Sequence, residues 1–404
     1  MPSPSPLAGS TARRPLLHGR LLAFAAILVA AFNLRTAVTS LTPLLEQLGQ
    51  VFGFGATMTG VLGMVPTAAF ALFGVSTPAL ARRIGLERTA LLAMALATAG
   101  LLARSLAGST GGLLVGSAIA LAGMGIGNVV VPPMVKRYFP DRVGTVSTLY
   151  ITVLQVGTML PALLAVPLAD AAGWRVSLGV WALISAFAML PLVWLKPGAH
   201  AAQTAATPGA PALQVWRTPL GWGLALMFGM TSLVSYSMFT WLPRLLVDAG
   251  ATPAFGGAMV ALFSALGLVS ALTMPAIAVR VRNPFPIVLL CFICLMCAFA
   301  GLLWAPLKAP LLWVALLGLG PSTFPLALTL INLRTRTAAG SSALSGFMQG
   351  VGYSFSCVGP LLFGLLHAWS GTWAGPFAFL VLCSVILLTA SWVACKPQKL
   401  EDQQ

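Results

Sequence analysis

Long apolar runs dominate this sequence and leave few folds open to it. Each run is about 20 residues long, which is the length that a helix needs to cross the hydrocarbon core of a bilayer. Twelve runs are separated by short polar or Pro- and Gly-rich turns, and they start near residues 21, 57, 89, 111, 143, 173, 219, 254, 284, 310, 340 and 374. Only 7% of the residues are charged, against about 25% in a soluble domain. We therefore expect an all-α membrane protein with twelve transmembrane helices.

Lys and Arg are spread unevenly over the gaps between these runs. All 22 of them lie in alternate gaps except five, which are Arg35, Arg104, Arg175, Arg244 and Lys308. Cytoplasmic loops carry an excess of Lys and Arg, so this pattern predicts that both termini are cytoplasmic. The net charge of +15 then reflects membrane topology, and it gives no support to nucleic-acid binding.

The chain divides into two similar halves. Residues 196–218 form the longest polar interruption, rich in Ala, Pro, Gly and Thr, which is typical of a linker. On either side, PALLAVPLADAAGW (161–174) parallels PLLFGLLHAWSGTW (360–373), and both run from Pro to Trp over the same spacing. The repeat predicts two pseudo-symmetric six-helix bundles, residues 1–195 and 219–404, the second ending in a short cytoplasmic tail.

Several longer motifs resemble one known family. They are NLRTAVTSLTPLL (33–45), GNVVVPPMVKRYFPDR (127–142), SYSMFTWLP (235–243), FPLALTLINLRTRT (324–337), ALSGFMQGVGY (343–353) and GPLLFGLLH (359–367). Together they resemble the branch of the major facilitator superfamily that contains bacterial cyanate transporters and nitroimidazole exporters. The loop PALARRIGLER (78–88) fits that superfamily's loop motif in part: Arg83 and Gly85 match it, while Pro78 replaces a Gly and Arg82 an Asp. Arg83 and Gly85 are therefore gating candidates.

The resemblance implies a carrier of the bacterial inner membrane. It would move a small anionic or electron-rich solute, cyanate-like, by alternating access, as a secondary active or facilitative transporter. Two alternatives stay open: an exporter of nitroimidazole-type or other xenobiotic compounds, and, from another class, a membrane sensor that binds a solute without moving it. We expect a monomer whose partners are this solute and the lipid bilayer, with no nucleic acid.

Arg35 is a permanent charge deep inside the first apolar run. It lies about 22 Å along a helix from Arg20, and an Arg at mid-membrane costs about 2.5–3.5 kcal/mol on insertion scales. On a continuous helix one face would carry four polar residues, namely Arg35, Thr39, Thr42 and Glu46. Such a face requires a water-filled cavity, so we predict that Arg35 and Thr39 bind substrate. The alternative is an arginine tied to carbonyls that holds the bundle together.

Other polar residues inside the runs are weaker candidates. The substrate-binding candidates among them are Asn128, Ser235, Tyr236, Gln349 and Tyr353. None of the seven acids is in the middle of a run, so Glu46 and His367 are the titratable candidates for coupling. Asn33 points away from the Arg35 face, and we expect it to join two helices.

Two arginines near the outer ends of their runs suggest interfacial roles. We expect Arg104 to snorkel towards the surface, and Trp241 with Arg244 to form an interfacial anchor.

The sequence argues against an enzyme. It has no His, Cys, Asp or Glu cluster at metal-ligand spacing, no phosphate-binding loop and no paired nucleophile and base. Cys291-x-x-Cys294-x-x-Cys297 lies in an uncharged apolar run, which favours packed thiols over metal ligands. We expect no metal and no cofactor.

Overall fold

The structure is a computed structural model that describes residues 20–195 and 214–403. Within these ranges, twelve helices are long and apolar enough to cross a membrane. The prediction of an all-α protein with twelve spans is confirmed. Each predicted start lies within about three residues of the observed one, because the length of an apolar run is a local property of the sequence.

The first six spans comprise the helices from α1 to α8. The first span is divided among α1 (Leu21–Asn33), α2 (Thr36–Thr39), the 3-10 turn η1 (Thr42–Leu44) and α3 (Leu45–Phe52). The next five are α4 (Ala56–Ile84), α5 (Leu86–Ser105), α6 (Thr110–Tyr138), α7 (Val143–Ala172) and α8 (Trp174–Trp194).

The last six spans begin after the short turn η2 (Val215–Arg217). They are α9 (Pro219–Asp248), α10 (Pro253–Arg280), α11 (Phe285–Trp304), α12 (Pro310–Leu319) continued by η3 (Gly320–Ser322) and α13 (Thr323–Leu333), α14 (Ala338–Cys357) continued by α15 (Gly359–Ser370), and α16 (Ala374–Ala394). The turn η4 (Leu400–Gln403) ends the described chain. Most of the predicted linker, 196–213, lies outside the described residues.

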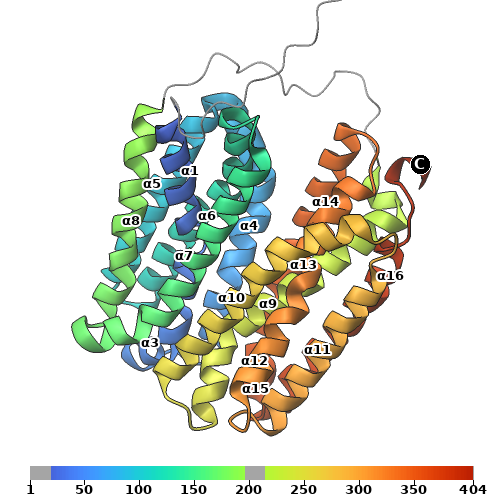
Figure 1. The fold of residues 1–404 in the computed structure, drawn as a ribbon. Helices are drawn as coiled ribbons and strands as arrows, with labels where there is room; N and C mark the ends of the chain where they lie inside the picture. Colours follow the sequence, from blue (N-terminus) through green and yellow to red (C-terminus); the bar gives the residue numbers. More distant parts are fainter. Residues whose placement is uncertain (1–19, 196–213, 404) are drawn as a thin grey trace, which may run out of the picture.

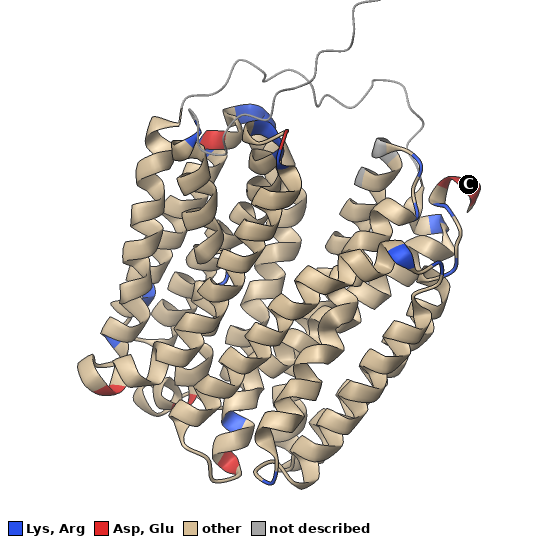
Figure 2. Cartoon of the chain, viewed as in Figure 1, with Lys and Arg blue, Asp and Glu red and all other residues tan. Residues whose placement is uncertain are grey.

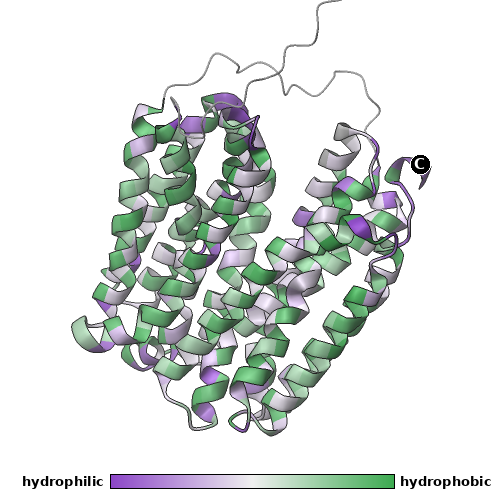
Figure 3. Ribbon diagram, in the orientation of Figure 1, coloured by the Kyte–Doolittle hydropathy of each residue, from purple (hydrophilic) through white to green (hydrophobic). Residues whose placement is uncertain are grey.

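The spans form two bundles that lie side by side, one blue to green and the other yellow to red (Figure 1). We call the end of the molecule that carries Arg20 and η4 the terminal face, and the end that carries Glu46 and Asp248 the distal face. Charged residues gather towards these two faces (Figure 2), and apolar residues cover most of the length between them (Figure 3). This distribution matches a bilayer around the middle of the bundles.

The first span is broken where a single helix was predicted. Hydroxyls in this segment donate to carbonyls three or four residues earlier, and they belong to Thr36, Thr39 and Ser40. Such bonds compete with the backbone ladder and bend helices. Pro43 then removes one backbone donor and disfavours helical geometry at the residue before it. The prediction of one continuous polar face through Arg35 and Glu46 is therefore wrong.

Two turns within the first bundle have the same backbone conformation. Gly85 connects α4 to α5 with φ 89° and ψ 157°, and Gly173 connects α7 to α8 with φ 86° and ψ 155°. This region is open only to glycine. At each of the two places, a single glycine thus reverses the direction of the chain.

The two bundles meet mainly through α4, α7 and their partners α14, α15 and α10. A Cβ placed on Gly63 of α4 would lie 2.9 Å from Cβ of Pro360 in α15. Gln155 Nε2 of α7 donates to Ser264 O of α10 at 2.9 Å. Glycine and a side-chain amide therefore allow helices from different bundles to approach closely.

Candidate functional site

Arg35 lies between α1 and α2, at the break in the first span. Its side chain is partially exposed, and its Nη1 donates to the hydroxyl of Tyr236 on α9 at 2.5 Å. The hydroxyl of Tyr353 on α14 also interacts with the guanidinium. No carboxylate among the described residues pairs with Arg35. An arginine of the first bundle thus contacts two tyrosines of the second.

Aromatic rings surround this guanidinium. Cζ of Arg35 lies 5.8 Å from the ring centre of Phe70 and 5.7 Å from that of Tyr236, within the range of cation–π attraction. The ring of Phe70 lies 6.2 Å from Tyr236 and 5.7 Å from Tyr353. We call Arg35, Phe70, Tyr236 and Tyr353 the central cluster. Of the predicted site residues, the structure brings Arg35, Tyr236 and Tyr353 together.

Phe70 was not predicted, because a phenylalanine in an apolar span gives no signal of its own. Its position beside a charge appears only when α4 packs against α9 and α14.

Four predicted binding residues bond to their own segments instead. Thr39 is 1% exposed and donates to Arg35 O at 3.3 Å, and Ser235 donates to Thr231 O at 2.8 Å. The amide groups of Asn128 and Gln349 donate to residues four positions earlier, at 2.9 Å. All but Thr39 are partially exposed. Their roles in binding stay predictions.

Asn33 joins two helices, as predicted. It is fully buried, and its Oδ1 accepts from Ser185 of α8 at 2.7 Å while its Nδ2 donates to Val29 O at 2.8 Å.

The interfacial roles predicted for Arg104 and Trp241 are wrong. Arg104 is 0% exposed and donates to Ala37 O and to Ser40 Oγ, so it is directed into the bundle. Trp241 is 2% exposed, and its Nε1 donates to Pro360 O at 2.8 Å. In both cases the side chain donates to a carbonyl or hydroxyl oxygen inside the protein, and not to water or lipid headgroups at the membrane surface.

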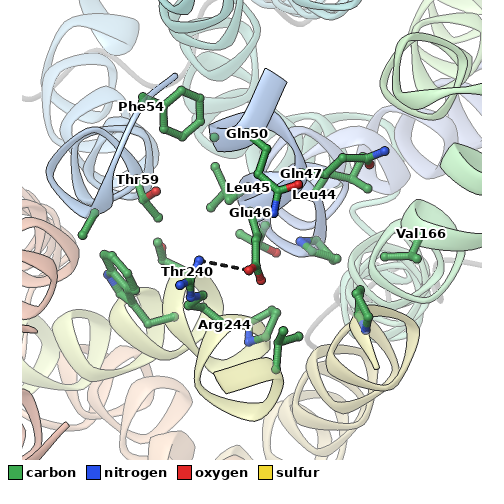
Figure 4. Close-up of a pocket in the computed structure, with 18 of the residues that line it drawn as sticks. Leu44, Leu45, Glu46, Gln47, Gln50, Phe54, Thr59, Val166, Thr240 and Arg244 are labelled. Atoms are coloured by element: carbon green, nitrogen blue, oxygen red, sulfur yellow. Dashed lines mark ion pairs between the residues drawn. The ribbon is translucent and has the colours of Figure 1, made fainter. Parts of the chain in front are cut away.

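The distal face contains a pocket of about 750 Å³ between the bundles. Inside it, Glu46 of α3 and Arg244 of α9 point towards one another and form an ion pair (Figure 4). The distance from Arg244 Nη1 to Glu46 Oε1 is 3.1 Å, and Arg244 Nε lies 2.7 Å from Asp248. Arg35 does not line this pocket. An ion pair therefore bridges the two bundles in the distal pocket, separately from the central cluster.

The coupling candidates Glu46 and His367 both line the distal pocket. The imidazole of His367 stacks on Trp373 with 3.8 Å between ring centres, and its Nε2 lies 4.0 Å from Asp248. Asp248 therefore pairs with Arg244 and lies 4.0 Å from His367. Sequence reasoning left Asp248 out because it stands at the end of a span, where a solvated acid is ordinary.

The gating candidates Arg83 and Gly85 lie at the terminal face. Arg83 is exposed at the end of α4, and Gly85 forms the turn described above. Glu87, in the first turn of α5, pairs with Arg137 of α6 at 3.1 Å. The turn is thus tied to another helix of its own bundle.

Ionic contacts also order the terminal face of the first bundle. Arg20 donates to Asp141 through two nitrogens. These bonds lower the pKa of Asp141 to about 2. At neutral pH the carboxylate is therefore fully charged and joins the start of α1 to the turn before α7.

Among the described residues, no group of three or more His, Cys, Asp and Glu side chains could hold a metal ion. The central cluster offers a cation, two hydroxyls and three aromatic rings.

Two bacterial proteins are similar to this chain over most of their length. The "2-nitroimidazole transporter" of Escherichia coli (strain K12) is 33% identical over 375 residues, covering 91% of this chain and 94% of that protein. The "Cyanate transport protein CynX" of the same organism is 29% identical over 364 residues, covering 90% and 94%.

Solved structures share the fold. A bacterial homolog of the human lysosomal transporter Spinster, in an inward-facing and occupied conformation, superposes with a TM-score of 0.76 at 14% identity, covering 97% of this chain and 99% of that one. A D-xylose-proton symporter gives a TM-score of 0.68 at 14% identity, covering 95% and 98%. The family model of the Major Facilitator Superfamily matches residues 23–357. The two bundles, the twelve spans and this match together mean that the chain belongs to the major facilitator superfamily of membrane transporters.

Proposed function

We propose that this chain is a secondary transporter that moves a small anionic or electron-rich solute, such as cyanate, by alternating access between its two bundles. The family and the transporter relatives favour transport over catalysis. The contact between Arg35 and Tyr236 carries the proposal, because it joins a charge from one bundle to a hydroxyl from the other at the centre of the molecule. A guanidinium presents a fixed fork of donors to an anion or a polarised group.

A nitroimidazole-type solute is the second candidate. Three aromatic rings stand around Arg35, and planar heteroaromatic solutes stack on such rings. The similarity to the 2-nitroimidazole transporter agrees with this chemistry. Export of such compounds is then the alternative direction of transport.

The proposal also covers the membrane, the oligomeric state and the orientation of the protein. We infer that residues 1–195 and 219–404 act as the two moving units, in a monomer of the bacterial inner membrane. Lys and Arg gather at the terminal face (Figure 2), which supports a cytoplasmic position for that face.

Flux in proteoliposomes tests the proposal. Radiolabelled cyanate, 2-nitroimidazole and a short carboxylate are offered separately to the wild type, to Arg35→Gln and to Arg175→Gln. The control removes another arginine that donates to a backbone carbonyl, Ala107 O at 3.4 Å, outside the central cluster. We expect flux in the wild type and the control and none in Arg35→Gln. Normal flux in Arg35→Gln would remove Arg35 from the site, and binding without any flux would favour the sensor.

A further inference from the structure

Arg104 is a second arginine inside the membrane-spanning region, and the proposed function does not use it. It lies one residue before the end of α5 and is 0% exposed. Its Nη1 donates to Ala37 O at 2.7 Å and its Nη2 to Ser40 Oγ at 2.6 Å. No ion pair among the described residues involves it. A buried charge without a carboxylate partner needs a reason to be there.

The carbonyl that Arg104 binds is released by the break in the first span. In a continuous helix Ala37 O would accept from the N–H of Leu41. Here the N–H of Leu41 donates to Val38 O at 3.2 Å instead. No backbone N–H among the described residues donates to Ala37 O. An unpaired carbonyl is costly inside a bilayer, so the guanidinium replaces the missing donor.

The same turn supports Arg35. The N–H groups of Val38 and Thr39 donate to Arg35 O at 3.1 and 3.3 Å. Arg104 binds Ala37 O, two residues after Arg35, and the hydroxyl of Ser40 one turn later. The backbone of Arg35 and the contacts of Arg104 are therefore parts of one short segment, α2 and its ends.

Arg104 is itself held firmly in place. A Cβ placed on Gly116 of α6 would lie 2.5 Å from the backbone N of Arg104. A Cβ on Gly100 would likewise meet the backbone of Ala120. The glycines let α5 and α6 pack against each other, which makes α5 a rigid support for the broken span.

We propose that Arg104 is a positioning residue for Arg35: it fixes α2 by binding Ala37 O and Ser40, so that the guanidinium of Arg35 stays directed at Tyr236. Because it is fully buried, Arg104 does not touch the solute. The proposal rests on the proposed function in taking Arg35 as the solute-binding group.

Hydrogen exchange tests the fixed segment without any solute. Amide exchange of peptides that cover residues 34–44 is measured by mass spectrometry in the full-length wild type, Arg104→Gln and Arg104→Lys. We expect exchange in this segment to become about tenfold faster in Arg104→Gln, because opening of a segment governs its exchange. Lys can reach one of the two acceptors, so Arg104→Lys should restore part of the protection. Arg175→Gln is the matched control and should leave these peptides unchanged.

Solute binding tests the action through Arg35. Kd for cyanate and for 2-nitroimidazole is measured with the wild type, Arg104→Gln, Tyr236→Phe and the double variant. We expect Arg104→Gln to raise Kd about tenfold, and to raise it much less when Tyr236→Phe is already present, since contacts in one network do not add. Additive effects would overturn the proposal.

The outcomes separate this proposal from the proposed function. Unchanged exchange of residues 34–44 in Arg104→Gln would overturn the positioning role, even if the melting temperature falls. If Arg104→Gln does not fold, Ser40→Ala removes one of the two acceptors and must speed exchange in the same peptides. If Arg35→Gln transports normally, the proposed site fails, while the exchange data still decide whether Arg104 fixes α2.

Discussion

Glu46 and Arg244 form an ion pair of 3.1 Å that joins the two bundles at the distal face. They come from α3 and α9, which lie in different halves of the chain. Arg244 also contacts Asp248 at 2.7 Å within its own helix. In the conformation described, these charges hold the distal side together, whereas the central cluster joins the bundles through a cation and rings.

Removing this pair should favour opening of the distal side. The Arg244 side chain is 44% exposed, so we expect at most about a fivefold rise in the open population of Glu46→Gln, as for exposed ion pairs worth about 0.2–1 kcal/mol. Electron–electron distance measurements between spin labels at Gln50 and Ala254, with the six native cysteines replaced, would report it. Arg244→Lys keeps the charge and should stay close to the wild type. A longer distance in Arg244→Lys but not in Glu46→Gln would contradict the role of the pair.

Much of the fold could be predicted because it depends on local properties. The apolar runs set the spans, because a run of about 20 apolar residues is read from neighbouring positions alone. The depth of Arg35 in its span could be predicted in the same way, because it depends only on the position of Arg35 within one apolar run. The break in the first span was not predicted, although Pro43 stood in the motif, because helical spacing alone does not reveal which hydroxyls bond back to carbonyls.

The partners within the site could not be predicted. Phe70 reaches Arg35 only through the packing of α4 against the second bundle. Arg104 was visible as a charge in an apolar run, but its acceptor, Ala37 O, exists only because the first span is broken. Contacts between distant segments depend on which helix faces meet, and one sequence without an alignment does not record that.

Tyr236→Phe should weaken solute binding. The substitution removes the hydroxyl that accepts from Arg35 and leaves the ring in place. Hydrogen bonds to charged groups contribute about 1.5–3 kcal/mol, so we expect Kd to rise about ten- to a hundredfold as the guanidinium loses its fixed direction. Calorimetric titration with the better-bound of cyanate and 2-nitroimidazole measures it. Tyr150→Phe, on α7 and outside the central cluster, is the control, and equal effects of the two variants would refute the assignment.

The glycine turns should tolerate no side chain. At Gly85 and Gly173 the values of φ are 89° and 86°, and a residue forced into such a region costs about 1–3 kcal/mol. We expect Gly85→Ala and Gly173→Ala to lower the melting temperature by similar amounts, because the two turns have the same conformation. Gly144 is helical with open space around its Cβ position, so Gly144→Ala should be neutral or slightly stabilising. Stability equal to the wild type in the first two variants would show that the turns relax.

The ion pair of Arg20 and Asp141 should make stability depend on pH in acid. Its hydrogen bonds lower the pKa of Asp141 from 3.8 to about 2, so the folded state favours the charged carboxylate. That contribution is present above the unfolded pKa, near 3.8, and is lost as the pH falls towards 2. The melting temperature of Asp141→Asn should therefore lie below that of the wild type at pH 5, and the difference should shrink as the pH approaches 2.

Asp170→Asn is the matched control for this pH series. Asp170 is exposed, and no ion pair among the described residues involves it. Its substitution should leave the melting temperature unchanged throughout. A difference between wild type and Asp141→Asn that stays constant from pH 5 to pH 2 would mean that the contact does not depend on the charge of Asp141.

Phe70→Leu should distinguish the two classes of solute. The ring of Phe70 lies beside Arg35 and between Tyr236 and Tyr353. Leucine keeps an apolar side chain of similar reach but offers no ring face to a heteroaromatic solute. An aromatic pair contributes about 0.5–1.5 kcal/mol beyond the area that it buries, so Kd for 2-nitroimidazole should rise about three- to tenfold. Cyanate has no ring, and its Kd should change less than twofold if Arg35 binds it by charge.

The comparison of the two solutes is the measurement that matters, because a general distortion of the site would weaken both. Phe54→Leu serves as the control, since Phe54 lines the distal pocket and not the central cluster. Equal losses for cyanate and 2-nitroimidazole in Phe70→Leu would assign the ring a packing role. A selective loss of 2-nitroimidazole would instead indicate that a planar ring stacks beside the guanidinium, and flux of the same compound in proteoliposomes would then give the direction in which it moves.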